Sequence, residues 1–215
     1  MTFSIAARCP QTGNLGIAVS TAIPAVGAIN PFARAQAGAL ATQGWSNPYL
    51  GIDGLDLLDR GLSAVDVMVR LLALDADNAR RQLSIVDAHG GVATYTGHEV
   101  RDWKGHCTGR GYVVAGNLLV GAETIEAMAD AYEAASEPLH ERLLLALEAG
   151  QAAGGDRRGR VSAALLVVGM EEYPCLDLRV DEHADPVAEL RRIHDTYLAL
   201  PYLTDLHPTR TWSKP

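Results

Sequence analysis

The sequence predicts an α+β fold in which helices and antiparallel strands occupy separate layers. Strand-like patterns occur in pairs joined by short turns, and helical patterns are grouped between these pairs. Because the strands are strongly apolar, two sheets packed face to face between helical layers would satisfy this pattern. With 215 residues, 48% of them hydrophobic, the chain can bury one substantial core. We therefore expect one domain spanning residues 1–215, with an irregular tail from about residue 200.

The first predicted element is a hairpin that begins at the N-terminus. Alternation places Phe3 and Ile5 on one face of a strand and Thr2 and Ser4 on the other. A turn with Pro, Gly and Asn separates this strand from the apolar run at 15–19. The N-terminal residues are thus expected to be fixed within a sheet.

Loop and helix patterns follow. The charge-poor segment 21–38 contains two prolines, which exclude a long helix, so we expect a packed loop leading to a buried strand at 39–43. Helical periodicity is present at 55–60 and again at 64–74, where Ser63 is a candidate N-cap.

The rest of the chain again has strands followed by helices. The predicted elements are a hairpin over 83–96 around a His-Gly-Gly turn, a strand within 111–119, helices within 121–136 and 138–155, strands within 160–170 and 175–183, and a helix over 186–197.

Composition limits the classes of partner. A net charge of −8 argues against nucleic acid, since binding phosphates requires clustered Lys and Arg. The cysteines Cys9, Cys107 and Cys175 are odd in number and lack paired metal spacing, which favours reduced thiols. The sequence shows neither an export signal nor a membrane-spanning run, so we expect a cytoplasmic protein without membrane contact.

Thr2 is the first candidate catalytic residue. If Met1 is removed, which is common before a small residue, the free α-amine lies beside the threonine hydroxyl and can serve as its base. A free α-amine titrates near pH 8, so its neutral form is available. The alternative is an ordinary β-branched strand residue.

Three motifs carry a resemblance to a known family: "TFSIAARCPQTGNLGIAVSTAIPAVGAINPFARAQAGALATQGWSNPYLG", "WKGHCTGRGYVVAGNLL" and "GGDRRGRVSAALLVV". In these the chain resembles the domain-of-unknown-function family 1028, which is similar in fold to N-terminal nucleophile (Ntn) hydrolases. The resemblance implies a four-layer αββα sandwich with two mainly antiparallel sheets, and it places Thr2 where that superfamily carries its nucleophile. In the family an acidic residue usually stands where this chain has Cys9.

A glycine-bounded loop is a candidate substrate-binding segment. Asp156, Arg157 and Arg158 lie just before a predicted strand, and Ser162 lies at its start. Guanidinium groups at this position could hold a substrate carboxylate bidentately. The alternative is a solvated turn in which the aspartate offsets its arginines.

The segment around Asn117 suggests an oxyanion site. The Asn117 amide, or nearby backbone N–H groups, could stabilise a developing oxyanion, and His106 is a candidate substrate contact. Cys107 with His106 could instead form a thiol nucleophile, although neighbours on a strand point to opposite faces. His89, His98 and His106 lack the spacing of a metal site, so no metal is expected.

Gln43 and Asn47 are further candidates for substrate binding. With Trp45 and Ser46 they end or follow a predicted buried strand, where an indole and amide groups could line a pocket mouth. An ordinary Asn-Pro turn is the alternative for this stretch.

Together these observations predict an Ntn-type amidohydrolase that acts on a small, carboxylate-bearing amide without a cofactor, with Thr2 as nucleophile. The protein is expected to form a homodimer. A non-catalytic binding or assembly protein with the same fold is the competing hypothesis. A thiol or metal hydrolase is the third.

Overall fold

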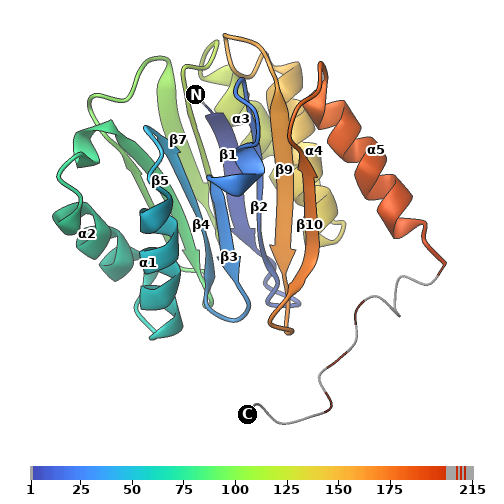
Figure 1. Ribbon diagram of the computed structural model, residues 1–215, viewed down its shortest axis with the longest axis horizontal. Helices are drawn as coiled ribbons and strands as arrows, with labels where there is room; N and C mark the ends of the chain where they lie inside the picture. The colour runs from blue at the N-terminus through green and yellow to red at the C-terminus, as the bar shows by residue number, and fades with distance from the viewer. Residues whose placement is uncertain (1, 202–206, 208, 210, 212–215) are drawn as a thin grey trace.

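The computed structural model describes residues 2–201, 207, 209 and 211, and it is built from four layers. Two antiparallel sheets pack face to face, and helices cover the outer face of each sheet (Figure 1). The α+β class and the αββα order of layers are thereby confirmed.

The larger sheet contains the N-terminal strand near its centre. Its strand order is β10-β9-β2-β1-β8-β7, and each neighbouring pair is antiparallel. The strands are β1 (Thr2–Arg8), β2 (Leu15–Thr21), β7 (Lys104–Gly109), β8 (Tyr112–Asn117), β9 (Ser162–Val168) and β10 (Pro174–Val180).

The smaller sheet has the order β3-β4-β5-β6. Its strands are β3 (Pro31–Arg34), β4 (Gly38–Gly44), β5 (Arg81–Asp87) and β6 (Val92–Thr96). Helices α1 (Pro48–Asp59) and α2 (Ala64–Leu74) pack on this sheet, whereas α3 (Glu123–Ala134), α4 (Leu139–Ala152) and α5 (Pro186–Leu198) pack on the larger one.

The two faces of β1 lie in different surroundings, as its alternation predicts. Phe3 and Ile5 enter the core beneath α3 and α4, while Ala6 lies in the core between the sheets. This inter-sheet core also contains Ala39 and Ala41. Small side chains there let the two sheets approach closely, so polar groups placed between them reach one another across the gap.

Three predicted elements are corrected by the structure. Segment 21–38 is not all loop, because β3 forms the edge of the smaller sheet, where a proline at the first strand position costs no ladder hydrogen bond. Helix α1 begins at Pro48 rather than near residue 55, because the Asn47 side chain accepts a hydrogen bond from the Tyr49 N–H. A strand, β7, also precedes the predicted strand at 111–119.

Other sequence-based boundaries are confirmed. Ser63 caps α2 by accepting a hydrogen bond from the Asp66 N–H at 3.2 Å. Helix α5 starts at Pro186. Met1 and most of the predicted irregular tail lie outside the described residues. Within the described part, no helix has the length and apolar character needed to cross a bilayer.

Candidate functional site

A row of polar residues crosses the larger sheet at the end where β1 begins. Thr2 pairs with Thr21 on one side and with Asn117 on the other, and Thr21 pairs in turn with Ser162. Residues directly opposite in an antiparallel pair share a face. Three of the predicted site residues are therefore brought into one row by strand register.

Thr2 is buried, with 5% of its surface exposed. Its Oγ1 lies 3.3 Å from Oγ1 of Thr21, within hydrogen-bond distance. Because its neighbours on both sides are fixed by the sheet, the hydroxyl has a defined position. A reacting group held this way loses little freedom when a substrate binds.

A network of buried amides lies between the sheets beside this row. Gln82 of β5 is its centre: its Oε1 accepts from Nε2 of Gln43 at 2.8 Å and from Nδ2 of Asn117 at 2.9 Å. Gln43 in turn accepts a hydrogen bond at 2.9 Å from the hydroxyl of Ser4, on the same face of β1 as Thr2. The network fixes the side chain of Asn117 opposite Thr2.

The backbone on both sides of this network is in the left-handed region. Leu118, directly after Asn117, has φ +53°, which is unusual for a residue with a side chain and recurs at functional sites. Gly44, directly after Gln43, has φ +82°, and a Cβ there would lie 2.7 Å from the Arg80 carbonyl oxygen. This position requires glycine, and the turn it makes leads directly to Trp45.

Asp156 fixes the predicted arginine loop. Its carboxylate accepts from the Ala22 N–H at 3.1 Å and from the Arg158 N–H at 2.9 Å, and it pairs with the Arg158 guanidinium at 3.0 Å. A bridge between Leu119 and Asp156 joins this loop to the segment just after Asn117. The buried carboxylate thus holds Arg158 at the same end of the sandwich as Thr2.

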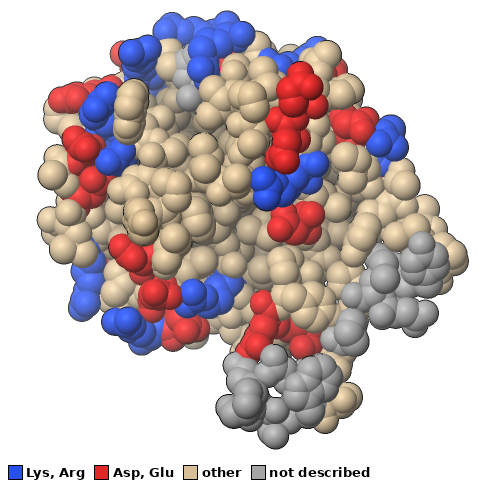
Figure 2. Space-filling model, viewed as in Figure 1, with Lys and Arg blue, Asp and Glu red and all other residues tan. Residues whose placement is uncertain are grey.

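A cavity of about 290 Å³ opens beside Asn117 at this end. Its lining includes three arginines and one glutamate together with an indole: Trp45, Arg80, Glu99, Arg101, Asn117 and Arg158. The Arg80 guanidinium lies over the Trp45 ring, 4.2 Å from its centroid. Figure 2 shows Lys and Arg gathered along the upper edge of the molecule, the edge where Figure 1 places the N-terminus. The cavity is therefore cationic in a chain of net charge −8.

Of the predicted catalytic and substrate-binding residues only Asn117 and Arg158 belong to this lining, and the others, including Thr2 and Gln43, do not. Arg157 is exposed, and its backbone N–H donates to the Leu118 carbonyl. The Ser162 hydroxyl donates to the Ile23 carbonyl and accepts from the Val26 N–H, so it holds the loop after β2. Asn47 caps α1.

His106 and Cys107 do not form a catalytic pair. His106 Nδ1 lies 2.8 Å from the Thr96 hydroxyl, whereas Cys107 packs against the core beneath α3, on the opposite face of β7. Burial raises the pKa of the Cys107 thiol, which disfavours the thiolate. This arrangement does not support a thiol nucleophile at Cys107.

The Trp45 indole lines the cavity as its place after the buried strand suggested, whereas three contributors to the site were missed by sequence reasoning: Arg80, Gln82 and Arg101. Gln82 lies in a strand whose residues alternate between polar and apolar. A polar residue in so apolar a strand was the one sequence signal that could have indicated a buried hydrogen-bond network. Arg80 and Arg101 lie in connecting segments, and only tertiary packing brings them to the cavity.

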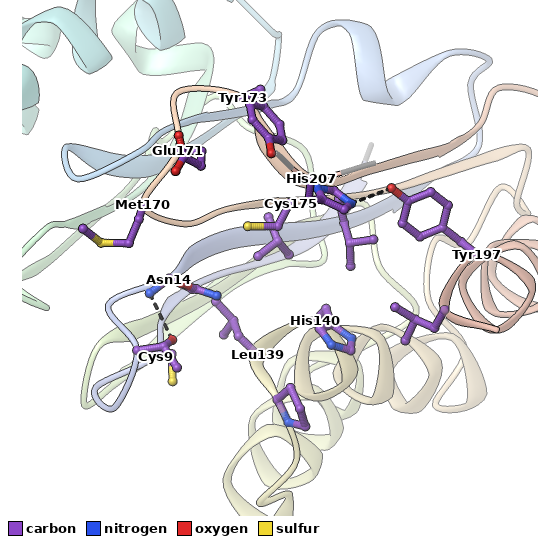
Figure 3. A pocket seen from close by; sticks show the side chains of 15 residues that line it. Cys9, Asn14, Leu139, His140, Met170, Glu171, Tyr173, Cys175, Tyr197 and His207 are labelled. Atoms are coloured by element: carbon purple, nitrogen blue, oxygen red, sulfur yellow. Dashed lines mark hydrogen bonds between the residues drawn. The ribbon is translucent and has the colours of Figure 1, made fainter. Parts of the chain in front are cut away.

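A second cavity, of about 330 Å³, lies at the other end of β1. Its lining includes Cys9 and Asn14 of the first hairpin, His140 of α4 and Tyr197 of α5, as Figure 3 shows. The Cys9 Sγ donates to Gln11 at 3.2 Å. This cavity contains none of the residues predicted to bind substrate.

Comparisons with known proteins show which family model and which solved structures this chain matches. A model described as a family of unknown function (DUF1028) matches residues 2–190. A crystal structure of protein SPO2555 from Silicibacter pomeroyi, assigned to the same family model, is 32% identical, with a TM-score of 0.88 over 95% of this chain and 92% of that one. Anbu (ancestral beta-subunit) from Yersinia bercovieri is 11% identical, with a TM-score of 0.41 over 98% and 100% of the two chains. The curated proteins include no significant match.

Proposed function

The chain belongs to the family of unknown function DUF1028, and we propose that it is an N-terminal nucleophile hydrolase that cleaves a small amide. The observation that carries this proposal is the position of Thr2. Its hydroxyl lies beside that of Thr21 at the end of a central strand, and its other strand neighbour, Asn117, lines the cationic cavity. Removal of Met1 would place an α-amine on the same residue.

In the proposed reaction, Oγ1 of Thr2 attacks the carbonyl carbon of the amide. The α-amine accepts the hydroxyl proton and delivers it to the leaving nitrogen as the C–N bond breaks. The acyl group remains as an ester on Thr2. The same amine then takes a proton from water, which attacks the ester carbonyl. The bond between the acyl carbon and Oγ1 breaks, the amine returns the proton to Oγ1, and the acid is released.

Asn117 is the proposed donor to the oxyanion of the tetrahedral intermediate. One N–H of its amide already donates to Gln82, and this bond orients the group. Its strand neighbour in the register is Thr2 itself. A donor that needs no reorientation during the reaction stabilises developing charge most effectively.

The charge of the cavity supports an anionic substrate. Arg80, Arg101 and Arg158 outnumber Glu99, and Arg158 is held in place by Asp156. A guanidinium binds a carboxylate through two parallel hydrogen bonds. We therefore propose an amide that carries a carboxylate as the substrate class.

The test is the intact mass of the purified protein before and after incubation with a β-lactone. The expected result is loss of one methionine, followed by a single acyl adduct that maps to Thr2. Thr2→Ala should lose the adduct and turnover, whereas Thr2→Ser, which keeps a hydroxyl beside the amine, should retain both. A protein that keeps Met1 and turns over amides would disprove the mechanism.

A binding protein is the second candidate function, and one observation favours it. Trp45 and three arginines line the cationic cavity, and the Thr2 hydroxyl is not part of this lining. On this hypothesis, Thr2→Ala would leave binding of a carboxylate ligand unchanged and no amide would be hydrolysed. The hydrolase hypothesis requires turnover that disappears with Thr2→Ala.

A further inference from the structure

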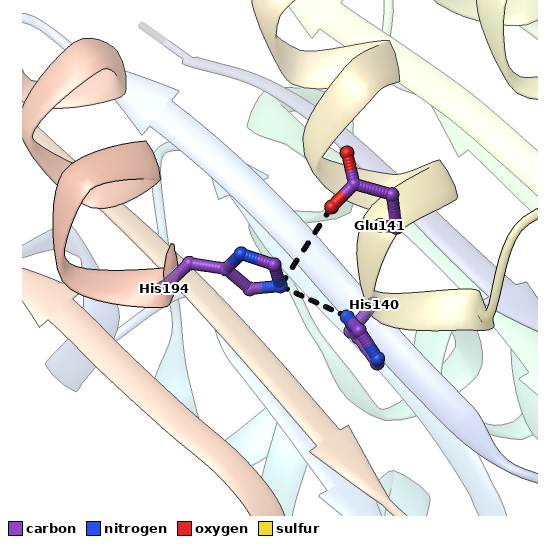
Figure 4. A group of neighbouring side chains, drawn as sticks. All are labelled: His140, Glu141 and His194. Carbon is purple, nitrogen blue, oxygen red and sulfur yellow. Dashed lines mark hydrogen bonds and ion pairs between the residues drawn. The ribbon is translucent and has the colours of Figure 1, made fainter. Parts of the chain in front are cut away.

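Two histidines and a carboxylate converge between helices α4 and α5, and none of the three lines the cationic cavity. Nδ1 of His140 and Nε2 of His194 are 2.9 Å apart, and Nε2 of His194 is 3.9 Å from Oε2 of Glu141. The three donor atoms all lie within 4.8 Å of one another. Figure 4 shows the side chains pointing toward one another, two from α4 and one from α5.

From this geometry we propose that His140, Glu141 and His194 bind a divalent transition-metal ion of the zinc type. Imidazole and carboxylate groups are established zinc ligands, with bonds of about 2.0–2.2 Å. Tetrahedral angles at that bond length separate neighbouring donor atoms by about 3.3 Å. The distances of 2.9 and 3.9 Å bracket this value, and the third pair of donor atoms lies within 4.8 Å, so side-chain rotations that bring Glu141 closer would complete the site.

His194 is prepared for this role by Asp195. Nδ1 of His194 lies 2.9 Å from Oδ1 of Asp195. An ionised carboxylate can only accept, so Nδ1 carries the proton and Nε2 presents its lone pair to His140 and Glu141. A carboxylate on the far nitrogen of a ligating histidine is the usual outer partner at zinc sites. With metal bound, His140 carries its own proton on Nε2.

The local charge also favours a cation. Arg191 of α5 pairs with Glu141 and Glu148 at 2.7 Å each, and with Asp195 at 3.5 Å. Three carboxylates thus surround one guanidinium, leaving an excess of negative charge beside two histidines. Arg191 also orients the Glu141 carboxylate, since a ligating carboxylate is itself usually hydrogen-bonded.

The site is both anchored and accessible. His194 has 1% of its surface exposed, whereas His140 is only partly buried and lines the cavity at the far end of β1 (Figure 3). An ion can therefore enter beside His140. Once bound, it would join α5 to α4, and the fourth coordination position would take water or an anionic group in the cavity.

The test uses the full-length protein stripped with a chelator and titrated with Zn²⁺, and with Co²⁺ as a spectroscopic probe. We expect one ion per chain, a visible Co²⁺ spectrum typical of tetrahedral nitrogen and oxygen ligation, and a thermal midpoint raised by roughly 5–10 °C at a hundredfold excess over Kd. Asp195→Ala should weaken binding by about 10–100-fold, and His140→Ala by more.

Neither substitution should unfold the protein, so a loss of binding would report on the metal site itself. Asp195 is exposed and His140 is half-buried, so both variants should fold, as circular dichroism without metal would verify. His98→Ala, at an exposed histidine elsewhere, serves as control and should bind normally. No saturable binding, or binding unchanged by both His140→Ala and Asp195→Ala, would overturn the proposal. Thr2→Ala should leave metal binding unaffected.

Discussion

Gln82 is the residue whose replacement tests the buried amide network most directly. In Gln82→Met the volume is nearly kept, so no large cavity forms and the main loss is hydrogen bonding. Its Oε1 accepts from the amides of Gln43 and Asn117. Its Nε2 lies within 3.1 Å of the Thr96 hydroxyl and of the Gly105 and Gly116 carbonyls.

The magnitude follows from the two donors that lose their acceptor. Gln43 and Asn117 are each 1% exposed, so water cannot readily replace Gln82. An orphaned buried donor costs about 1–3 kcal/mol, which gives roughly 2–6 kcal/mol for the pair. Added burial of the apolar methionine offsets about 1 kcal/mol. We expect the free energy of unfolding to fall by about 1–5 kcal/mol, compared with a typical total of about 5–15 kcal/mol.

The assay is urea unfolding of Gln82→Met beside Gln151→Met. Among the described residues, the buried Oε1 of Gln151 has no hydrogen-bond partner, so its replacement should cost at most about 1 kcal/mol. Equal m-values would show that the denatured states are comparable. The reasoning fails if Gln82→Met is as mild as Gln151→Met, because the network would then contribute nothing beyond the volume of its side chains.

Further predictions concern the cavity, the thiol and the response to pH. Arg158→Ala should weaken binding of a carboxylate substrate by roughly tenfold or more, measured as KM or Kd, whereas Arg157→Ala, exposed and outside the cavity, should leave it unchanged. Cys107→Ala should keep full turnover, and the Cys107 thiol should react with iodoacetamide more slowly than free cysteine, because burial raises its pKa; loss of turnover would revive the thiol hypothesis. Burial lowers the pKa of His106, so the unfolded chain binds its proton first and stability falls as pH drops below about 6.5. His106→Gln should reduce this loss in urea unfolding between about pH 7 and 5, and an unchanged slope would contradict it.

Much of the fold could be predicted from local sequence patterns. The alternation at residues 2–8 and the turn that follows specify the first hairpin, and the capping serine specifies the start of α2. Strand β3 was missed because a four-residue edge strand with a proline carries almost no periodic signal. The start of α1 was missed because the cap at Asn47 precedes a weakly amphipathic turn.

The candidate site was only partly predictable. Thr2 and Asn117 were chosen from separate motifs, and the register between β1 and β8 shows that they are neighbours. Arg157 and Arg158 are adjacent, and the sequence pattern does not distinguish them. In the structure only Arg158 pairs with the buried carboxylate of Asp156 and lines the cavity. Sequence gives the residue types in a loop, whereas side-chain direction depends on the backbone turn that the rest of the fold imposes.

The sequence by itself determined the layered class of the fold, the apolar and polar faces of β1, and the presence of a hydroxyl at its first position. These features depend on neighbouring residues, whose spacing along the chain is fixed by backbone geometry. Tertiary structure alone decided which arginines line the cavity, that Gln82 orients Asn117, and that His140 meets His194 across 54 positions of sequence. Such contacts join separate elements, and their distances are set by how sheets and helices pack rather than by spacing along the chain.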